Sequence, residues 1–232
     1  MKIAIICARG GSKRIPNKNI KLLAGQPLIS YSIEAVKNAN IFDRIIVSTD
    51  DQSIADVAEK YGVCVPFLRT SMTDDFIHVH ESAIESALQA ENYFNEKYDT
   101  FFLTCPTSPF VTSELIREAF DTFSTCGKQG LKIFEPNITP SHSARIINGK
   151  VSPLFPSEWK KRSQDSEEVY SKMNNAIFIA NREAALLENT LELADLYVMK
   201  CYDKFVFVDI DTPEDFIFAN VLMIGKKICS YF

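Results

Sequence analysis

Short apolar runs alternate with longer amphipathic stretches along most of this chain. The runs have the length of buried strands, whereas the stretches between them repeat their apolar residues with helical spacing. Strands separated by helices of this length predict a mostly parallel sheet with right-handed crossovers. We therefore expect an α/β fold in which helices flank a twisted sheet. The expected strands are 3–7, 44–48, 63–68, 100–104, 130–134, 175–180, 196–200 and 205–208, and the expected helices are 27–38, 51–61, 78–94, 113–124, 182–187 and one from residue 213.

The pattern changes after residue 136, where Pro, Asn, Ser and Gly accumulate and the apolar runs become short. We expect residues 137–172 to leave the main sheet as a small excursion within a single domain that spans residues 1–232. Phe155 and Trp159 lie among polar residues in this segment, and large apolar side chains of this kind need a surface to cover them. The excursion therefore predicts a homodimer.

Composition narrows the class of protein. The 232 residues suit one α/β domain, and 46% hydrophobic with 24% charged residues is ordinary for a globular protein. A formal net charge of -5 argues against nucleic acids and anionic membranes as partners, and no apolar stretch approaches the ~20 residues that span a bilayer. The six cysteines are scattered without a C-x-x-C pair, which is typical of reduced thiols in a cytoplasmic protein.

The segment from Ala8 to Lys21, called the basic loop below, follows the first expected strand. Gly10 and Gly11 allow its backbone to turn sharply and to approach a ligand closely. A strand that ends in such a loop is how α/β proteins hold a polyphosphate, although neither G-x-x-x-x-G-K-[ST] nor G-x-G-x-x-G is present. A solvated basic loop is the alternative, but Pro16 favours fixed turns. The positive residues are Arg9, Lys13, Arg14, Lys18 and Lys21.

Asp209 and Asp211 follow the last expected strand. Two residues apart in an extended segment, their carboxylates share a face and repel one another unless a cation lies between them. The pair predicts a Mg²⁺ site, because this ion prefers carboxylates, water and substrate phosphates. The alternative is that the aspartates cap the helix that Thr212 and Pro213 begin. Together with the basic loop, the pair indicates nucleotidyl transfer.

Six segments in one order resemble the cytidylyltransferases that activate nine-carbon α-keto acid sugars, the sialic, pseudaminic and legionaminic acids. This resemblance implies a Rossmann-like nucleotidyltransferase fold. It also implies transfer of CMP from CTP to the anomeric hydroxyl of such a sugar, with release of pyrophosphate, for cell-surface or flagellar glycan synthesis. The segments are 8–21, 23–29, 46–50, 106–109, 162–165 and 209–211.

The resemblance also assigns expected roles to individual residues, and it implies a dimer arm that lends residues to the neighbour's site. The expected catalytic residues are Lys18, Lys13, Arg9 and Asp211. The expected CTP-binding residues are Arg9, Gly10, Gly11, Ser12, Lys13, Asn19 and Arg69. The expected sugar-binding residues are Cys105, Thr107, Ser108, Arg162, Gln164, Lys172 and Asn174. The expected Mg²⁺ ligands are Asp209 and Asp211.

Two departures leave the sugar open. Cys105 stands where sialic-acid members usually carry glutamine, and 110–111 is Phe-Val where they carry leucine-arginine. Residues 162–165 resemble the pseudaminic-acid branch, whereas 170–176 do not match it well. A sugar-1-phosphate nucleotidylyltransferase of similar fold and a non-catalytic nucleotide-binding subunit remain as alternatives.

Overall fold

The computed structural model describes residues 1–70, 79–137, 143–162, 165, 169–171 and 176–229. Its strands are β1 (Lys2–Cys7), β2 (Leu22–Leu23), β3 (Gln26–Pro27), β4 (Arg44–Ser48), β5 (Thr100–Thr104), β6 (Gly130–Asn137), β7 (Ala144–Ile147), β8 (Lys150–Pro153), β9 (Val169–Ser171), β10 (Phe178–Asn181) and β11 (Leu196–Lys200). Its α-helices are α1 (Leu28–Ala39), α2 (Gln52–Lys60), α3 (Val79–Phe94), α4 (Ser113–Thr125), α5 (Arg182–Glu188) and α6 (Pro213–Cys229). The 3₁₀ helices η1 (Lys18–Ile20) and η4 (Lys204–Phe207) lie in connections.

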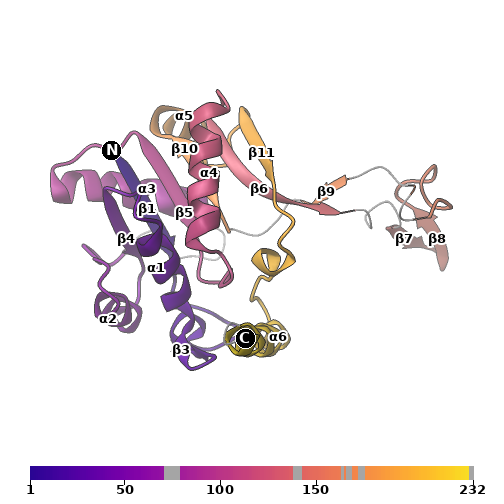
Figure 1. Ribbon diagram of the computed structural model, residues 1–232, viewed down its shortest axis with the longest axis horizontal. Helices are drawn as coiled ribbons and strands as arrows, with labels where there is room; N and C mark the ends of the chain where they lie inside the picture. Colours follow the sequence, from indigo (N-terminus) through magenta and orange to yellow (C-terminus); the bar gives the residue numbers. More distant parts are fainter. Residues whose placement is uncertain (71–78, 138–142, 163–164, 166–168, 172–175, 230–232) are drawn as a thin grey trace.

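The main sheet has the strand order β11-β6-β10-β5-β1-β4, and β9 pairs with the outer part of β6. β1 runs parallel to β4 and β5, and β11 runs parallel to β6. β10 is antiparallel to both of its neighbours, β5 and β6. Helices lie on either side of the sheet (Figure 1). The expected α/β fold with a largely parallel sheet is confirmed.

The sheet separates two hydrophobic clusters, one on each of its faces, and β1 contributes side chains to both. Its alternating side chains explain this, because successive residues of a strand point to opposite faces. Ala4 and Ile6 belong to the cluster that contains residues of α1 and α4. Ile3 and Ile5 belong to the cluster that contains residues of α3 and α5. The central strands are therefore buried on both sides, as their continuous apolar runs indicate.

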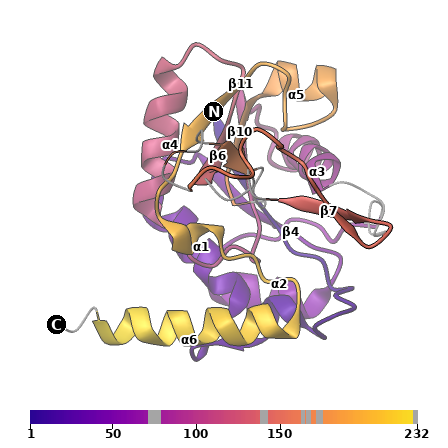
Figure 2. The same ribbon diagram turned by 90° about the vertical axis from the view of Figure 1, so that its right-hand side faces the viewer.

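Helix α6 closes one end of the domain (Figure 2). Phe216, Ala219 and Met223 pack in a third cluster with apolar residues of the basic loop and of the start of α1. The Asn220 side chain also accepts a hydrogen bond from the Ala24 amide at 2.7 Å. These contacts bring the segment before α6 beside the basic loop, nearly two hundred residues away in the sequence.

Two expected strands are wrong. Residues 205–208 lie mostly within η4, because the Asp203 side chain accepts a hydrogen bond from the Phe205 amide at 3.0 Å and starts a helical turn. Residues 63–68 form only isolated bridges, Ile46 with Cys64 and Thr49 with Leu68. Pro66 interrupts this segment, and a proline has no amide hydrogen for a sheet.

The β7–β8 hairpin projects from the body beyond the β6–β9 ribbon (Figure 1). Ile146 and Val151 lie opposite one another across this antiparallel pair, so their side chains share a face. Both are largely exposed, at 79% and 62%. None of the helices in the described ranges is both long and apolar enough to cross a membrane.

Candidate active site

Four segments meet beyond the carboxyl ends of β1, β4 and β5. They are the basic loop, residues 48–51, residues 105–110 and the 208–212 linker between η4 and α6. The Ile210 amide donates to the Thr107 carbonyl at 2.9 Å, and the Lys18 Nζ donates to the Ile210 carbonyl at 2.6 Å. Ligands of open α/β sheets bind at this edge, because the strand ends and their loops leave a crevice there. We call this region the strand-end site.

Short-range hydrogen bonds fix the basic loop. The Ser12 amide donates to the Gly10 carbonyl at 2.8 Å, which closes a tight turn. The buried Asn19 donates from Nδ2 to the Arg9 carbonyl at 2.9 Å. The Arg9 and Lys13 side chains are exposed to solvent. The loop is therefore an ordered cationic surface with backbone groups at its turn, as expected for a segment that receives phosphates.

Lys18 lies against the carboxylate segment. Its Nζ is 3.5 Å from Asp211 Oδ1, and its side chain is only 12% exposed. Arg14 also approaches Asp211, with Nη1 3.8 Å from Oδ2. The role of Arg14 in this contact was missed by the sequence analysis, because only the fold brings residue 211 to the basic loop.

Asp209 is the more buried of the two carboxylates. Burial raises the pKa of its carboxyl, a hydrogen bond from the Thr107 side chain lowers it, and the charge of Asp211 raises it again. The net shift is upward. Asp209 Oδ1 is buried and accepts no hydrogen bond from the described residues. An oxygen in this condition is suited to a cation.

Asp211 carries a second role at its backbone. The Asp211 and Thr212 amides donate to Asp215 Oδ2 at 3.1 and 2.8 Å, and the Asp215 amide donates to Thr212 Oγ1 at 3.2 Å. This reciprocal arrangement caps the start of α6. Capping thus involves the Asp211 backbone and the Asp215 side chain, which leaves the Asp211 carboxylate facing Lys18 and Arg14.

The Cys105 thiol lies close enough to several charged side chains for their charges to shift its pKa. Burial raises the pKa of its thiol well above the ordinary value, and neighbouring Cys7 and Asp209 raise it further. The positive charges of Lys18 and Arg69 act on the same thiol in the opposite direction. Cys105 itself is buried, as is Ser108, while Thr107 is half-buried. The structure therefore brings Lys18, Arg69, Cys105 and Asp209 to one place.

Arg69 reaches this place from the segment after α2. It is 9% exposed, and its amide donates to the Thr49 carbonyl at 2.8 Å. Its charge also acts on the Cys7 thiol, whose pKa burial raises to about 11. The Arg69 side chain is therefore buried at the strand-end site and is not a surface charge.

Part of the expected sugar-binding set lies elsewhere. Arg162 is in the segment between β8 and β9, where it forms an ion pair with Asp165 through Nε and Oδ2 at 2.6 Å. Gln164, Lys172 and Asn174 lie outside the described residues. No group of three or more His, Cys, Asp or Glu side chains among the described residues is arranged to hold a metal ion, so Asp209 and Asp211 stand as a pair.

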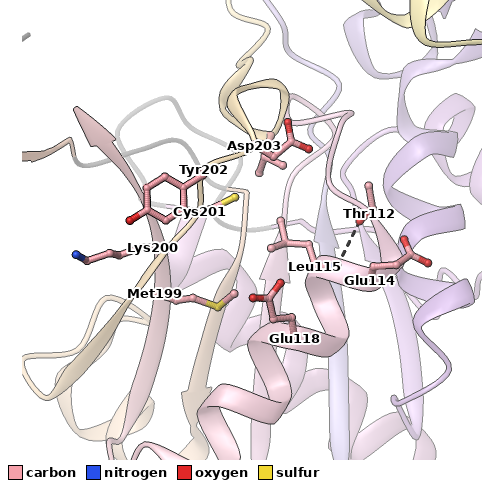
Figure 3. A pocket seen from close by; sticks show the side chains of 10 residues that line it. Thr112, Glu114, Leu115, Glu118, Met199, Lys200, Cys201, Tyr202 and Asp203 are labelled. Atoms are coloured by element: carbon pink, nitrogen blue, oxygen red, sulfur yellow. Dashed lines mark hydrogen bonds between the residues drawn. The ribbon is translucent and has the colours of Figure 1, made fainter. Parts of the chain in front are cut away.

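A separate pocket lies between the start of α4 and the end of β11 (Figure 3). Its volume is about 290 Å³. Leu115, Met199 and Val206 contribute apolar side chains to it, and Glu118 and Asp203 contribute carboxylates. None of the expected site residues lines this pocket. It is distinct from the strand-end site.

The fold and the strand-end site together define a nucleotidyltransferase: a cationic loop for a polyphosphate beside a carboxylate pair at the edge of an α/β sheet. The chain belongs to the cytidylyltransferase family, whose model matches residues 3–228. The resemblance seen in the sequence is confirmed.

Two curated relatives are similar over nearly their whole length. Pseudaminic acid cytidylyltransferase of Campylobacter jejuni serotype O:23/36 is 33% identical over 229 residues, which is 95% of each chain. CMP-N,N'-diacetyllegionaminic acid synthase of Legionella pneumophila is 33% identical over 226 residues, again 95% of each. N-acylneuraminate cytidylyltransferase of Escherichia coli O18:K1:H7 is also 33% identical, but the chain spans about half of that relative, 52%.

Among solved structures, CMP:2-keto-3-deoxy-manno-octonic acid synthetase complexed with CTP superposes with a TM-score of 0.70. The match covers 97% of this chain and 99% of that one at 13% sequence identity. At this identity the likeness supports the fold alone.

Proposed function

We propose that this protein transfers CMP from CTP to the anomeric hydroxyl of a nine-carbon α-keto acid sugar and releases pyrophosphate. The observation that carries the proposal is the position of Lys18, which joins the basic loop to the Asp209–Asp211 segment through hydrogen-bond and ion-pair contacts. The relatives act on sugars of this class according to their names, pseudaminic acid and N,N'-diacetyllegionaminic acid.

The proposed step is a direct displacement. The anomeric oxygen of the sugar forms a bond to the α-phosphorus, the bond from that phosphorus to its β-bridging oxygen breaks, and the hydroxyl proton is released. Negative charge redistributes over the phosphates as pyrophosphate leaves, so groups that stabilise it lower the barrier. We assign Lys18, which lies beside Asp211, to the charge at the α-phosphate, and the exposed Arg9 and Lys13 to the β and γ phosphates.

A Mg²⁺ ion fits the carboxylate pair. This ion prefers hard oxygen ligands. Asp209 offers its buried Oδ1, which accepts no hydrogen bond from the described residues, and the Asp211 carboxylate lies close enough for its charge to act on Asp209. Bound there, Mg²⁺ would neutralise part of the triphosphate charge. Thr107 would orient Asp209, because its side chain donates to that carboxylate.

Specificity for the two substrates is assigned to different parts of the site. We assign Arg69, which is buried at the strand-end site, to the base, because a guanidinium can donate to the carbonyl of cytosine. Cys105, Thr107 and Ser108 would contact the sugar. Cys105 supplies no strong hydrogen-bonding group, which favours a sugar with an apolar substituent at that position.

We further propose that the protein acts as a homodimer. The β7–β8 hairpin projects from the body (Figure 1), and its Ile146 and Val151 side chains are exposed. In this arrangement the arm that contains Arg162, Gln164, Lys172 and Asn174 would complete the sugar pocket of the partner subunit, with positive charge for the sugar carboxylate.

Pyrophosphate release from CTP, measured with a panel of nine-carbon sugars, tests the proposed function. We expect turnover that depends on one of pseudaminic, legionaminic or neuraminic acid, that prefers CTP to ATP and GTP, and that stops in excess chelator. Equal turnover with ATP or GTP would contradict the assignment of Arg69. Turnover with a sugar-1-phosphate but not with the free sugar would indicate a sugar-1-phosphate nucleotidylyltransferase. No turnover with any sugar would indicate a non-catalytic nucleotide-binding subunit.

A further inference from the structure

Asp50 holds the turn of the basic loop from the neighbouring strand. The Gly10 amide donates to Asp50 Oδ1 at 2.8 Å, across 40 positions of sequence. Two residues earlier, the Ala8 amide donates to the Ser48 carbonyl at 3.0 Å. The spacing of two continues the ladder between β1 and β4, in which Cys7 is the register partner of Ser48. The Asp50 carboxylate thus accepts the hydrogen bond that a backbone carbonyl would accept if the ladder continued.

Gly10 is also packed too closely for any other residue. A Cβ at this position would lie 2.5 Å from Asp51 Oδ2 and 2.7 Å from Asp51 Cβ. Asp51 cannot move freely, because its side chain caps α2 by accepting hydrogen bonds from the Ser53 and Ile54 amides at 2.8 and 3.3 Å. The turn at Gly10 therefore packs directly against the start of α2, and the Gly10 amide is hydrogen-bonded to Asp50.

The same segment holds Arg69 from its other side. The Thr49 carbonyl accepts the Arg69 amide at 2.8 Å, and Thr49 bridges to Leu68. Residues 48–51 are therefore a common support: Asp50 fixes the phosphate loop through Gly10, and Thr49 fixes the arginine assigned to the base. The distance between these two halves of a nucleotide site is then set by one short piece of backbone.

We propose that Asp50 is a positioning residue that sets the phosphate-binding turn at the correct distance from Arg69, so that one CTP molecule can contact both. This inference rests on the proposed function. It adds a residue to which the sequence analysis gave no role. A carboxylate beside a loop that binds a polyanion costs electrostatic energy, which is tolerable where the carboxylate orders the loop. The Asp50 carboxylate accepts a hydrogen bond at the next position of the β1–β4 ladder. This contact indicates that Asp50 orders the loop and does not simply occupy the position of a phosphate.

The experiment compares three variants by CTP binding in calorimetry and by steady-state turnover. Asp50→Ala removes the acceptor for the Gly10 amide, and we expect the Kd and KM for CTP to rise by about tenfold or more, with a smaller change in kcat. Asp50→Asn keeps an oxygen acceptor without the charge and should stay within about threefold of the parent protein. Asp56→Ala is the matched control: it removes an exposed carboxylate from α2 that accepts a local hydrogen bond from the Gln52 side chain at 2.7 Å, and it should behave as the parent does.

A readout without nucleotide tests the contact itself. Hydrogen exchange at the Gly10 amide, followed by NMR, should accelerate in Asp50→Ala and remain slow in Asp50→Asn. Four outcomes overturn the proposal: unchanged CTP affinity in Asp50→Ala, tighter binding in that variant, an Asp50→Asn protein as weak as Asp50→Ala, or unchanged exchange at Gly10. Tighter binding would mean that Asp50 competes with phosphate. A parent protein that binds no CTP would instead overturn the proposed function, a result visible before any variant is compared.

Discussion

Lys18 illustrates how a single side chain joins distant parts of this site. Its Nζ donates to the Ile210 carbonyl at 2.6 Å, a contact between residues 192 positions apart. The side chain is 12% exposed and lies 3.5 Å from Asp211. Its position is therefore set by the folded core and not by the basic loop alone. A cation that is already in place when charge develops stabilises the transition state without reorganisation.

Changing Lys18 to alanine should therefore affect kcat more than CTP binding. We expect a fall in kcat of about two orders of magnitude with a change in KM for CTP of less than about threefold, because the charge matters most as negative charge redistributes at the α-phosphate. Steady-state kinetics over CTP concentration measure both. Lys21→Ala is the control, since Lys21 belongs to the same loop but lies over the Phe216 ring. A loss confined to KM would show that Lys18 only holds the nucleotide.

The Asp211 carboxylate is the second test at this scale. Asp211→Asn keeps size and hydrogen bonding but removes the charge, and its backbone amide can still donate to Asp215. We expect the protein to fold while catalysis falls by about two orders of magnitude or more at limiting Mg²⁺. The measurement is turnover over a Mg²⁺ titration with circular dichroism as the folding check, and Glu214→Gln, an exposed neighbour at the start of α6, is the control. Parent turnover in folded Asp211→Asn would mean that the carboxylate pair is structural.

The residue-scale prediction from sequence succeeded where the chemistry was local. The basic loop carries its cations and glycines within fourteen consecutive residues, so it was visible without a fold. The contacts of Asp50 with Gly10 and of Arg14 with Asp211 were not visible, because neither residue has a local signal for a partner 40 or nearly 200 positions away. The pairing of β1 with β4 brings the first two residues together, and the packing of α6 beside the basic loop brings the second two together.

At the scale of elements, the expected bounds of β4, β5 and β11 agree with the structure, although β4 and β11 lie at the two ends of the strand order and β11 is largely exposed. Their apolar runs are short and end at turns, which is the signal that predicted them. The run before Asp209 was misleading. Val206 and Phe207 are both buried although they are adjacent, which a helical turn allows and a strand with one buried face does not. The antiparallel direction of β10 also follows from the sheet and not from its own residues.

One ion pair joins two elements on the α3 face of the sheet. Arg182, the first residue of α5, donates from Nε and Nη2 to the two carboxylate oxygens of Glu91 in α3, at 2.8 and 2.9 Å. The Tyr98 amide donates to the same carboxylate at 3.1 Å. Burial raises the pKa of Glu91, but these hydrogen bonds and the Arg182 charge lower it more, so the net shift is downward. The two side chains are 13% and 20% exposed, which makes this a largely buried pair.

Glu91→Gln should therefore destabilise the protein by about 2 kcal/mol at pH 7, because Arg182 is left without its counter-charge. A carboxyl whose pKa is lowered by folding contributes stability above its unfolded pKa, and this contribution is lost as pH falls through the folded value. The difference between parent and variant should thus shrink below about pH 4. Urea unfolding at pH 7 and at pH 3.5 measures it. Glu183→Gln, an exposed change in α5, should have little effect, and a gap that stays constant with pH would contradict the linkage.

At the scale of the whole molecule, the β7–β8 hairpin is a part of the chain whose apolar side chains the domain does not cover. The main sheet is covered by helices on both faces, and its two clusters are closed. The β7–β8 hairpin instead stands apart from the body (Figure 1), with Ile146 and Val151 exposed on one face. Exposed apolar side chains on a projecting two-stranded hairpin are unstable in water unless something covers them. In the homodimer that we propose, a second copy of the chain covers this face.

The double change Ile146→Glu/Val151→Glu should therefore convert a dimer to a monomer. Two carboxylates directly opposite one another on the hairpin face would also have to be buried in the interface, which costs far more than leaving them in water. Sedimentation velocity at micromolar concentration should show the parent as a dimer and the variant as a monomer. Turnover should fall with dissociation, because a monomer lacks the partner's arm over its sugar pocket, while CTP affinity should remain close to that of the parent.

The matched control is Leu187→Glu, which places a carboxylate on an apolar side chain that is 87% exposed on α5 in the body. It should leave both the sedimentation coefficient and turnover unchanged, since this position lies on the domain and not on the arm. A parent protein that sediments as a monomer with full activity would refute the dimer. A monomeric double variant with undiminished turnover would separate the two claims: the hairpin would then hold the subunits together, but each subunit would bind its sugar with its own residues.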